Sequence, residues 1–231
     1  GIDWVKKGVS FPGASQIGDP VLTFDSLGNL YYTQLYQSGS TYGIWVTKST
    51  DKGLTFTTTV SAHSSTVGLA DKQWITADQT GGPYSNNVYL GWRQFGSSGM
   101  RFVRSTNGGL NWSVPITLSG DQGAYVTVGA NGNIQGGNVY FGCTSGSSIR
   151  IYRSTDGGAS FGAGIVAVSG IAGPGVICAG RNTMKNCIRT NYFPLMAADN
   201  SFTSSRGNVY IIYAANPAGS DLADIFLVRS T

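Results

Sequence analysis

Polar residues that could bind a ligand or take part in a reaction occur at a few points along the 231-residue chain. The candidates for ligand binding combine carboxylates, cations, an amide and an indole, and they are Asp19, Asp71, Lys72, Gln73, Trp92, Arg93, Asp121, Arg181 and Arg189. Arginine near aromatic rings binds carboxylates or stacks on sugar faces. Two aspartates such as Asp19 and Asp71 could hydrolyse a glycoside if their carboxyls lie roughly 5–9.5 Å apart. The alternative is that each residue is an ordinary solvated side chain or a turn cap.

Several kinds of active site are excluded by what the chain lacks. His63 is the only histidine and no Cys-x-x-Cys pair occurs, so we expect no metal site. Neither a nucleophile elbow nor a phosphate-binding loop is present, and we expect no cofactor. The net charge is only +4, and Lys48, Arg104, Arg153 and Arg229 are spread along the chain rather than clustered. Nucleic-acid binding is therefore not expected.

The cysteines leave two alternatives open. Cys178 and Cys187 bracket a polar, glycine-rich stretch and could form a local disulfide. A disulfide would imply an oxidising compartment, whereas two free thiols would not. No apolar run reaches the ~18 residues that a membrane-spanning helix needs, and no signal peptide is visible.

The composition predicts strands rather than helices. Glycine accounts for 34 residues, charged residues for 11% and hydrophobic residues for 41%. Glutamate, a common helix-surface residue, is absent, while β-branched, aromatic and small residues predominate. We therefore expect a single all-β domain with many short strands and tight turns.

One short pattern occurs three times and begins a fourth time. Its complete copies, which we call box loops, span Ser49–Phe56, Ser105–Trp112 and Ser154–Phe161, and Ser230-Thr231 begins another. The repeated positions are Ser49, Asp51, Gly53, Phe56, Ser105, Asn107, Gly109, Trp112, Ser154, Asp156, Gly158 and Phe161. Asp and Asn side chains bond nearby backbone N–H groups, glycine permits positive φ, and the aromatic ring can pack between layers. We expect these residues to be structural.

Apolar runs recur at equivalent places around each box loop and define four-stranded units, with strands a to d. The units are approximately 19–60, 71–118, 121–168 and 192–231, with 1–11 as strand d of a preceding or closing unit. The last assignment rests on Gly1-Ile2-Asp3-Trp4, which matches the second half of a box loop, and on the run Val5–Val9 that follows. A repeat of ~40–50 residues with four strands predicts a β-propeller blade.

The box pattern Ser-x-Asp-x-Gly-x-x-(Trp/Phe) resembles the Asp box, or BNR repeat, of sialidase-type β-propellers. The resemblance covers nearly the whole chain, and Asn107 departs from it in the second copy. It implies six blades, so the roughly four visible blades are expected to be part of a larger propeller. The alternative is a ring of four blades that closes where Thr231 meets Gly1. The resemblance also places the box loops on the face opposite the ligand site, among whose variable loops the candidate ligand residues fall.

Catalytic residues do not transfer from the family. The resemblance implies three arginines, an Asp acid/base and a Tyr nucleophile activated by a Glu, but this chain has no Glu and no Arg-Ile-Pro motif. We therefore expect an exported or cell-surface propeller that acts as a non-catalytic glycan- or protein-binding module or scaffold. The alternative is a fragment of a sialidase-like glycoside hydrolase whose missing blades carry the Glu and further arginines. Expected partners are a glycan, an extracellular protein, or further blades of the same polypeptide.

Overall fold

Antiparallel sheets follow one another along the chain in this computed structural model, which describes residues 3–9, 13–56, 58–217 and 221–230. The first sheet contains β1 (Ser15–Phe24), β2 (Leu30–Ser38), β3 (Thr41–Ser49) and β4 (Thr58–Ser65). The second contains β5 (Ala70–Ala77), β6 (Val88–Gln94), β7 (Met100–Ser105) and β8 (Ile116–Leu118). The third contains β9 (Gln122–Asn131), β10 (Ile134–Ser145), β11 (Ser148–Ser154) and β12 (Ile165–Val168).

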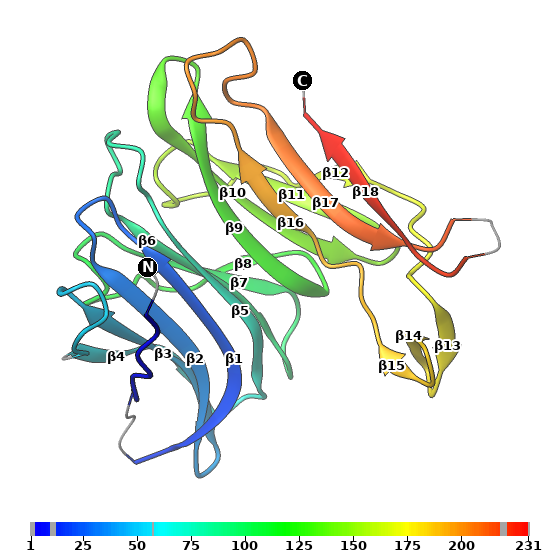
Figure 1. Cartoon of the computed structure of the whole chain (residues 1–231), viewed down its shortest axis with the longest axis horizontal. Helices are drawn as coiled ribbons and strands as arrows, with labels where there is room; N and C mark the ends of the chain where they lie inside the picture. Colours follow the sequence, from blue (N-terminus) through cyan, green and yellow to red (C-terminus); the bar gives the residue numbers. More distant parts are fainter. Residues whose placement is uncertain (1–2, 10–12, 57, 218–220, 231) are drawn as a thin grey trace.

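A three-stranded sheet completes the series with β16 (Leu195–Ala198), β17 (Val209–Ala215) and β18 (Asp224–Arg229). We call the four sheets blades 1 to 4. Their strands pair in chain order, as expected for strands a to d of a propeller blade, and Figure 1 shows the blades arranged in an arc. The prediction of an all-β propeller of antiparallel blades is confirmed. None of the described residues forms a helix, so none provides a helix that could cross a membrane.

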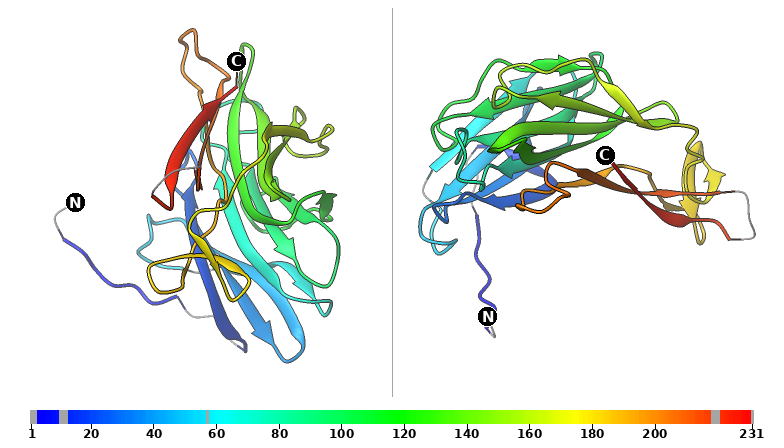
Figure 2. Two further views of the ribbon diagram at one scale, coloured as in Figure 1. Left: turned by 90° about the vertical axis from the view of Figure 1, so that its right-hand side faces the viewer. Right: turned by 90° about the horizontal axis from the view of Figure 1, so that it is seen from above.

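Residues 3–9 differ from the prediction of a strand over Val5–Val9. They form no strand, and the side chain of Trp4 is 96% exposed. Figure 2 shows this segment projecting away from the sheets. Residues 1, 2, 10 and 11 of the proposed 1–11 unit lie outside the described part of the chain.

The core consists of the layers between successive blades. Tyr31 and Ile44 of blade 1 pack with Leu90 of blade 2, and Phe102 of blade 2 packs with Phe141 of blade 3. A third layer lies between blades 3 and 4. Gly91 allows one close approach, because a Cβ on it would lie 2.5 Å from the ring of Phe141.

The box loops are closed by side-chain hydrogen bonds. In the first, Ser49 Oγ donates to Asp51 Oδ1 (2.6 Å) and accepts from the Gly53 N–H (2.8 Å). Asp51 also accepts from the N–H and hydroxyl of Thr55. The other two loops repeat the serine contacts. Asn107 preserves the pattern through its Oδ1, which accepts from Ser105 Oγ (3.0 Å).

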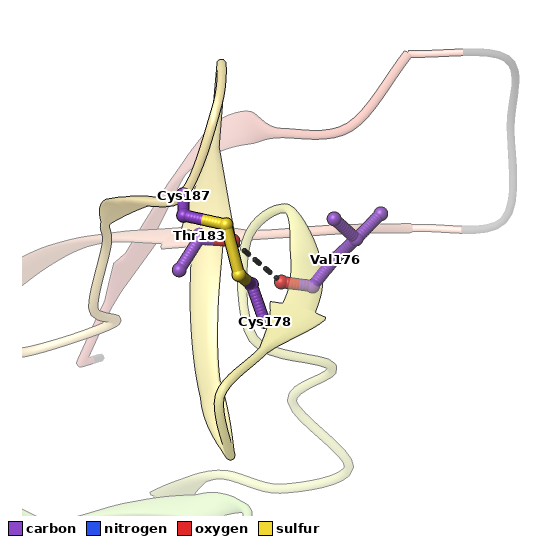
Figure 3. Close-up of a disulfide and its surroundings, with 4 residues drawn as sticks. All are labelled: Val176, Cys178, Thr183 and Cys187. Atoms are coloured by element: carbon purple, nitrogen blue, oxygen red, sulfur yellow. Dashed lines mark hydrogen bonds between the residues drawn. A yellow bond between two sulfur atoms is a disulfide. The ribbon is translucent and has the colours of Figure 1, made fainter.

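The long connection between blades 3 and 4 forms a small sheet of its own. It contains β13 (Val176–Cys178), β14 (Arg181–Met184) and β15 (Ile188–Arg189). A disulfide joins Cys178 to Cys187, which resolves the alternative left open by the sequence. Thr183 Oγ1 donates to the Val176 carbonyl beside it (Figure 3). Cys143 is a buried free thiol, and burial raises its pKa to about 12.

The box loops predict an acid-sensitive contribution to stability. Hydrogen bonds from Ser49 and Thr55 lower the pKa of Asp51 to about 2. Burial raises the pKa of Asp156, but hydrogen bonds from Ser154 and Ser160 outweigh it and lower that pKa to about 2 as well. Because both folded-state pKa values lie below the unfolded value of about 3.9, the stabilisation is present above about pH 4 and is lost as the pH falls toward 2.

We expect the double variant Asp51→Asn/Asp156→Asn to lose less unfolding free energy than the native chain between pH 5 and pH 2.5. Asparagine keeps one acceptor in each loop, as Asn107 does, but carries no titrating charge. Urea unfolding at a series of pH values measures the effect, with Asp3→Asn, outside the sheets, as the control. Parallel pH profiles for the double variant and the native chain would contradict this account.

Candidate functional site

We call the first strand of each blade its inner strand. The inner strands β1, β5 and β9 of blades 1 to 3 each carry a bulge at the same position. Asp19 and Pro20 oppose the single residue Gln34 across the β1–β2 pair. Lys72 and Gln73 oppose Trp92, and Gly123 and Ala124 oppose Cys143, in the next two blades. The first residue of each bulge has a positive φ: 54° at Asp19, 52° at Lys72 and 70° at Gly123. Bulges bend a strand and re-aim its side chains, often beside functional sites.

Equivalent triplets from the four blades meet at these bulges and line one cavity of about 200 Å³, which we call the mouth pocket. The triplets are Asp19-Pro20-Val21, Lys72-Gln73-Trp74, Gly123-Ala124-Tyr125 and Phe193-Pro194-Leu195. The rings of Trp74 and Tyr125 stack with centroids 4.1 Å apart. The pocket therefore joins aromatic walls to polar groups on the inner strands.

Gln73 is the most unusual polar residue of the mouth pocket. Its side chain is only 2% exposed, and its Nε2 donates to the Asp19 carbonyl. Its Oε1 is buried and has no hydrogen-bond partner. A buried acceptor without a donor costs roughly 1–3 kcal/mol. A ligand hydroxyl or amide that donated to Gln73 would remove this cost.

A polar hollow of about 270 Å³ adjoins the mouth pocket, and we call it the rim hollow. It is lined by Asp19, Asp71, Lys72, Arg189, Asn191 and Phe193. Asp71 Oδ2 accepts from Gln122 Nε2 (2.6 Å), which ties this carboxylate to blade 3. Arg189 comes from β15, so the disulfide-linked insertion supplies one of the two cations. Two carboxylates and two cations balance the formal charge of the hollow.

The structure thus brings Asp19, Asp71, Lys72, Gln73 and Arg189 together from distant parts of the sequence. Two other candidates brace nearby loops instead. Asp121 Oδ2 accepts from the Gly146 N–H (2.5 Å). Arg93 donates to the carbonyls of Gly99 (3.0 Å) and Gly120 (3.3 Å). Arg181 lies exposed on β14 and lines neither cavity.

Trp92 does not contact either cavity, contrary to the expectation from sequence. Its side chain is fully buried, its Nε1 donates to Gln94 Oε1 (3.1 Å), and its ring packs on His63. The reason is that β6 lies inside its sheet, with neighbouring blades covering it. Burial also lowers the pKa of His63, which bonds to Gln94 as well.

Sequence reasoning missed the apolar half of the site: Trp74, Tyr125, Phe193 and Pro194. An alignment of the residues around the start of each strand a would have found them, because they occupy equivalent triplets. Among the described residues, no group of three His, Cys, Asp or Glu side chains could hold a metal ion.

Comparison with known proteins identifies the fold but no family. No protein-family model matches the chain, and no curated protein matches it either. The solved structure of the Hadza microbial sialidase Hz136 superposes on this chain with a TM-score of 0.52 at 14% identity, covering 90% of this chain and 43% of that one. The chain has a sialidase-like β-propeller fold.

Two further solved structures have a similar fold. The NanB sialidase from Streptococcus pneumoniae gives a TM-score of 0.50 at 13% identity, covering 93% of this chain and 32% of that one. A fructofuranosidase from Schwanniomyces occidentalis gives 0.52 at 13% identity, covering 94% and 44%. The chain therefore spans less than half the length of these three proteins, and at such identities the likeness concerns the fold alone.

The bulge at Gly123 generates a stability prediction with a matched control. A Cβ at Gly123 would lie 2.6 Å from the Phe193 ring, and its φ is positive. Gly132 also has a positive φ, 56°, but its Cβ would meet nothing. We expect Gly132→Ala to destabilise the chain by about 1–2 kcal/mol, the cost of a left-handed alanine, and Gly123→Ala to cost more because Phe193 must move. Urea unfolding of both variants measures the difference, and equal losses would show that the Phe193 ring does not restrict the space at Gly123.

Proposed function

We propose that this protein is an exported, non-catalytic module that binds a glycan across the mouth pocket and the rim hollow. The observation that carries the proposal is the buried, unpartnered Oε1 of Gln73 beside the stacked rings of Trp74 and Tyr125. Sugars present hydroxyl donors and apolar ring faces together, which are the two features that this pocket can accept. The disulfide supports an oxidising, extracellular setting.

The balanced charge of the rim hollow favours a neutral sugar over an acidic one. A sugar hydroxyl can donate to Asp19 or Asp71 and accept from Lys72 or Arg189. A sugar carboxylate would gain the two cations but would also face the two carboxylates at close range. We therefore infer that a hydroxyl-rich neutral oligosaccharide is the ligand class.

A second candidate function is glycoside hydrolysis by a longer protein that includes this chain. Asp19 and Asp71 line the same hollow, and a glycosidase needs two carboxyls flanking its substrate. The structurally similar proteins include a sialidase and a fructofuranosidase, which are glycan-processing enzymes. In the sialidase version of that candidate the glutamate would come from the rest of the longer protein, because this chain has none.

Binding is tested first with a glycan array and then by calorimetry on the best neutral oligosaccharide. We expect Arg189→Ala to weaken the affinity by about tenfold, the loss of one charged hydrogen bond. Arg181→Ala is the matched control, because Arg181 lies in the same insertion but outside both cavities. Lys72→Asn removes the second cation and still tolerates a positive φ. Equal effects of Arg189→Ala and Arg181→Ala would place the ligand elsewhere.

An assay of glycoside hydrolysis distinguishes the two candidate functions. We expect no release of chromophore from neutral or sialylated aryl glycosides by the native chain. Asp19→Asn and Asp71→Asn should then alter glycan affinity without any associated change in rate. Release that either substitution abolishes would instead support the hydrolase and contradict a non-catalytic module.

A further inference from the structure

The disulfide-linked insertion lies between two anchored points of the chain. On one side the Gly175 N–H donates to the Leu222 carbonyl (2.7 Å) and the Gly175 carbonyl accepts from Asn216 Nδ2 (3.1 Å), which holds the approach to β13 against blade 4. On the other side the Tyr192 hydroxyl donates to the Gly146 carbonyl of blade 3 (2.8 Å). Between these points the small sheet of β13, β14 and β15 projects from the blades (Figure 1). The position of this sheet therefore depends on its own internal contacts.

The shortest strand of the insertion, β15, has few contacts that hold it in place. It consists of Ile188 and Arg189, and its strand partner within the described part of the chain is β14. Ile188 is 64% exposed, and Arg189 is exposed as well. The next residue, Thr190, donates from its backbone N–H to the Asn182 carbonyl (2.9 Å) and from its hydroxyl to the Pro174 carbonyl (2.7 Å). These bonds act with very little apolar burial to support them.

The backbone just before β15 adopts a conformation that costs free energy. Lys185, Asn186 and Cys187 are three consecutive residues in the left-handed region, with φ values of 40°, 57° and 68°. Residues other than glycine and asparagine rarely adopt this region, and they do so singly rather than in runs. A constraint from outside the loop must therefore offset the cost. The disulfide supplies it, because it ties Cys187 to Cys178 at the end of β13 (Figure 3).

The disulfide thus connects the anchored side of the insertion to Arg189, which follows Cys187 by two residues and lines the rim hollow. Cys187 is exposed and Cys178 is half-buried, so a dissolved thiol reaches the disulfide from the side of Cys187. Exposed disulfides are the ones that regulatory thiol exchange uses, whereas enclosed structural disulfides resist reduction. This disulfide combines such access with control over a residue of the candidate site.

We propose that this disulfide is a redox switch for the rim hollow: the oxidised form holds Arg189 at the hollow, and reduction releases Arg189 and weakens ligand binding. The proposal rests on the proposed function, because it concerns the affinity of the same site. A thiolate of a dithiol reductant attacks the sulfur of Cys187 and expels Cys178 as a thiolate, which takes up a proton. The second thiol of the reductant then displaces Cys187, which takes up the second proton. The reductant leaves as a disulfide that has given up two electrons.

Contacts with blade 3 confine the effect of reduction to the insertion. Tyr192 keeps its bond to the Gly146 carbonyl when the disulfide is broken, so the adjacent Phe193 stays at the mouth pocket. The third cysteine, Cys143, is buried and donates to the Ser119 carbonyl (3.6 Å). Burial raises its pKa to about 12, so it forms little of the thiolate that exchange requires.

Hydrogen exchange of the chain with and without dithiothreitol, a dithiol, tests the release in the absence of any glycan. We expect the Thr190 amide, which donates to Asn182, to exchange at least about tenfold faster after reduction. The Ile171 amide, which donates to the Ser147 carbonyl ahead of the insertion, is the internal control and should not change. Equal exchange at Thr190 in the oxidised and reduced chains overturns the proposal, because the insertion then holds Arg189 without its disulfide.

Calorimetry with the neutral oligosaccharide then measures the effect of reduction on affinity. We expect dithiothreitol to weaken binding by the native chain about tenfold, as Arg189→Ala does, and to leave the affinity of the Arg189→Ala chain unchanged. The variant Cys178→Ser/Cys187→Ser should match the reduced native chain with or without dithiothreitol. The reduced native chain alone gives the same test where that variant does not fold. An Arg189→Ala chain that reduction weakens as much as the native chain overturns the switch, because another residue then carries the effect.

The two proposals fail in different ways. An oxidised chain that binds no glycan contradicts the proposed function, and the exchange at Thr190 still decides whether the disulfide holds the insertion. Glycan binding that reduction leaves unchanged overturns the redox switch and leaves the proposed function intact.

Discussion

Each sheet of this protein has two faces to cover, and only neighbouring sheets are available to cover them. The blades therefore depend on one another, and their stability comes from the layers between them rather than from any one sheet. The glycines of the central strands show how closely the layers approach: Gly91 faces Phe141, and a Cβ at Gly142 would lie 2.6 Å from the sulfur of Met196. Among the described residues blade 4 has a neighbouring blade on one side only, and Ile225 and Leu227 of this blade are exposed.

The packing of the blades also determines where a binding site can form. Inner strands that lie side by side must converge at their starts, and the bulges place two residues there where a regular strand would place one. The extra residue turns side chains such as that of Gln73 toward the common opening. The box loops at the other end of the strands have no such freedom, since their serine and aspartate side chains bond to the loop itself. Uniform turns at one end and irregular starts at the other thus divide the molecule into a scaffold and a candidate binding face.

The repeats made the fold predictable, because a propeller is one short pattern of strands applied several times. The box loops, the strand order and the location of the variable connections could all be deduced from equivalent positions. Convergence of Asp19, Asp71, Lys72 and Gln73 followed from the same reasoning, since each precedes or begins a strand a. The error at Trp92 arose because a sequence does not show which face of a strand the next blade covers. Arg189 reaches the rim only through the path of the disulfide-linked insertion, which no repeat could specify.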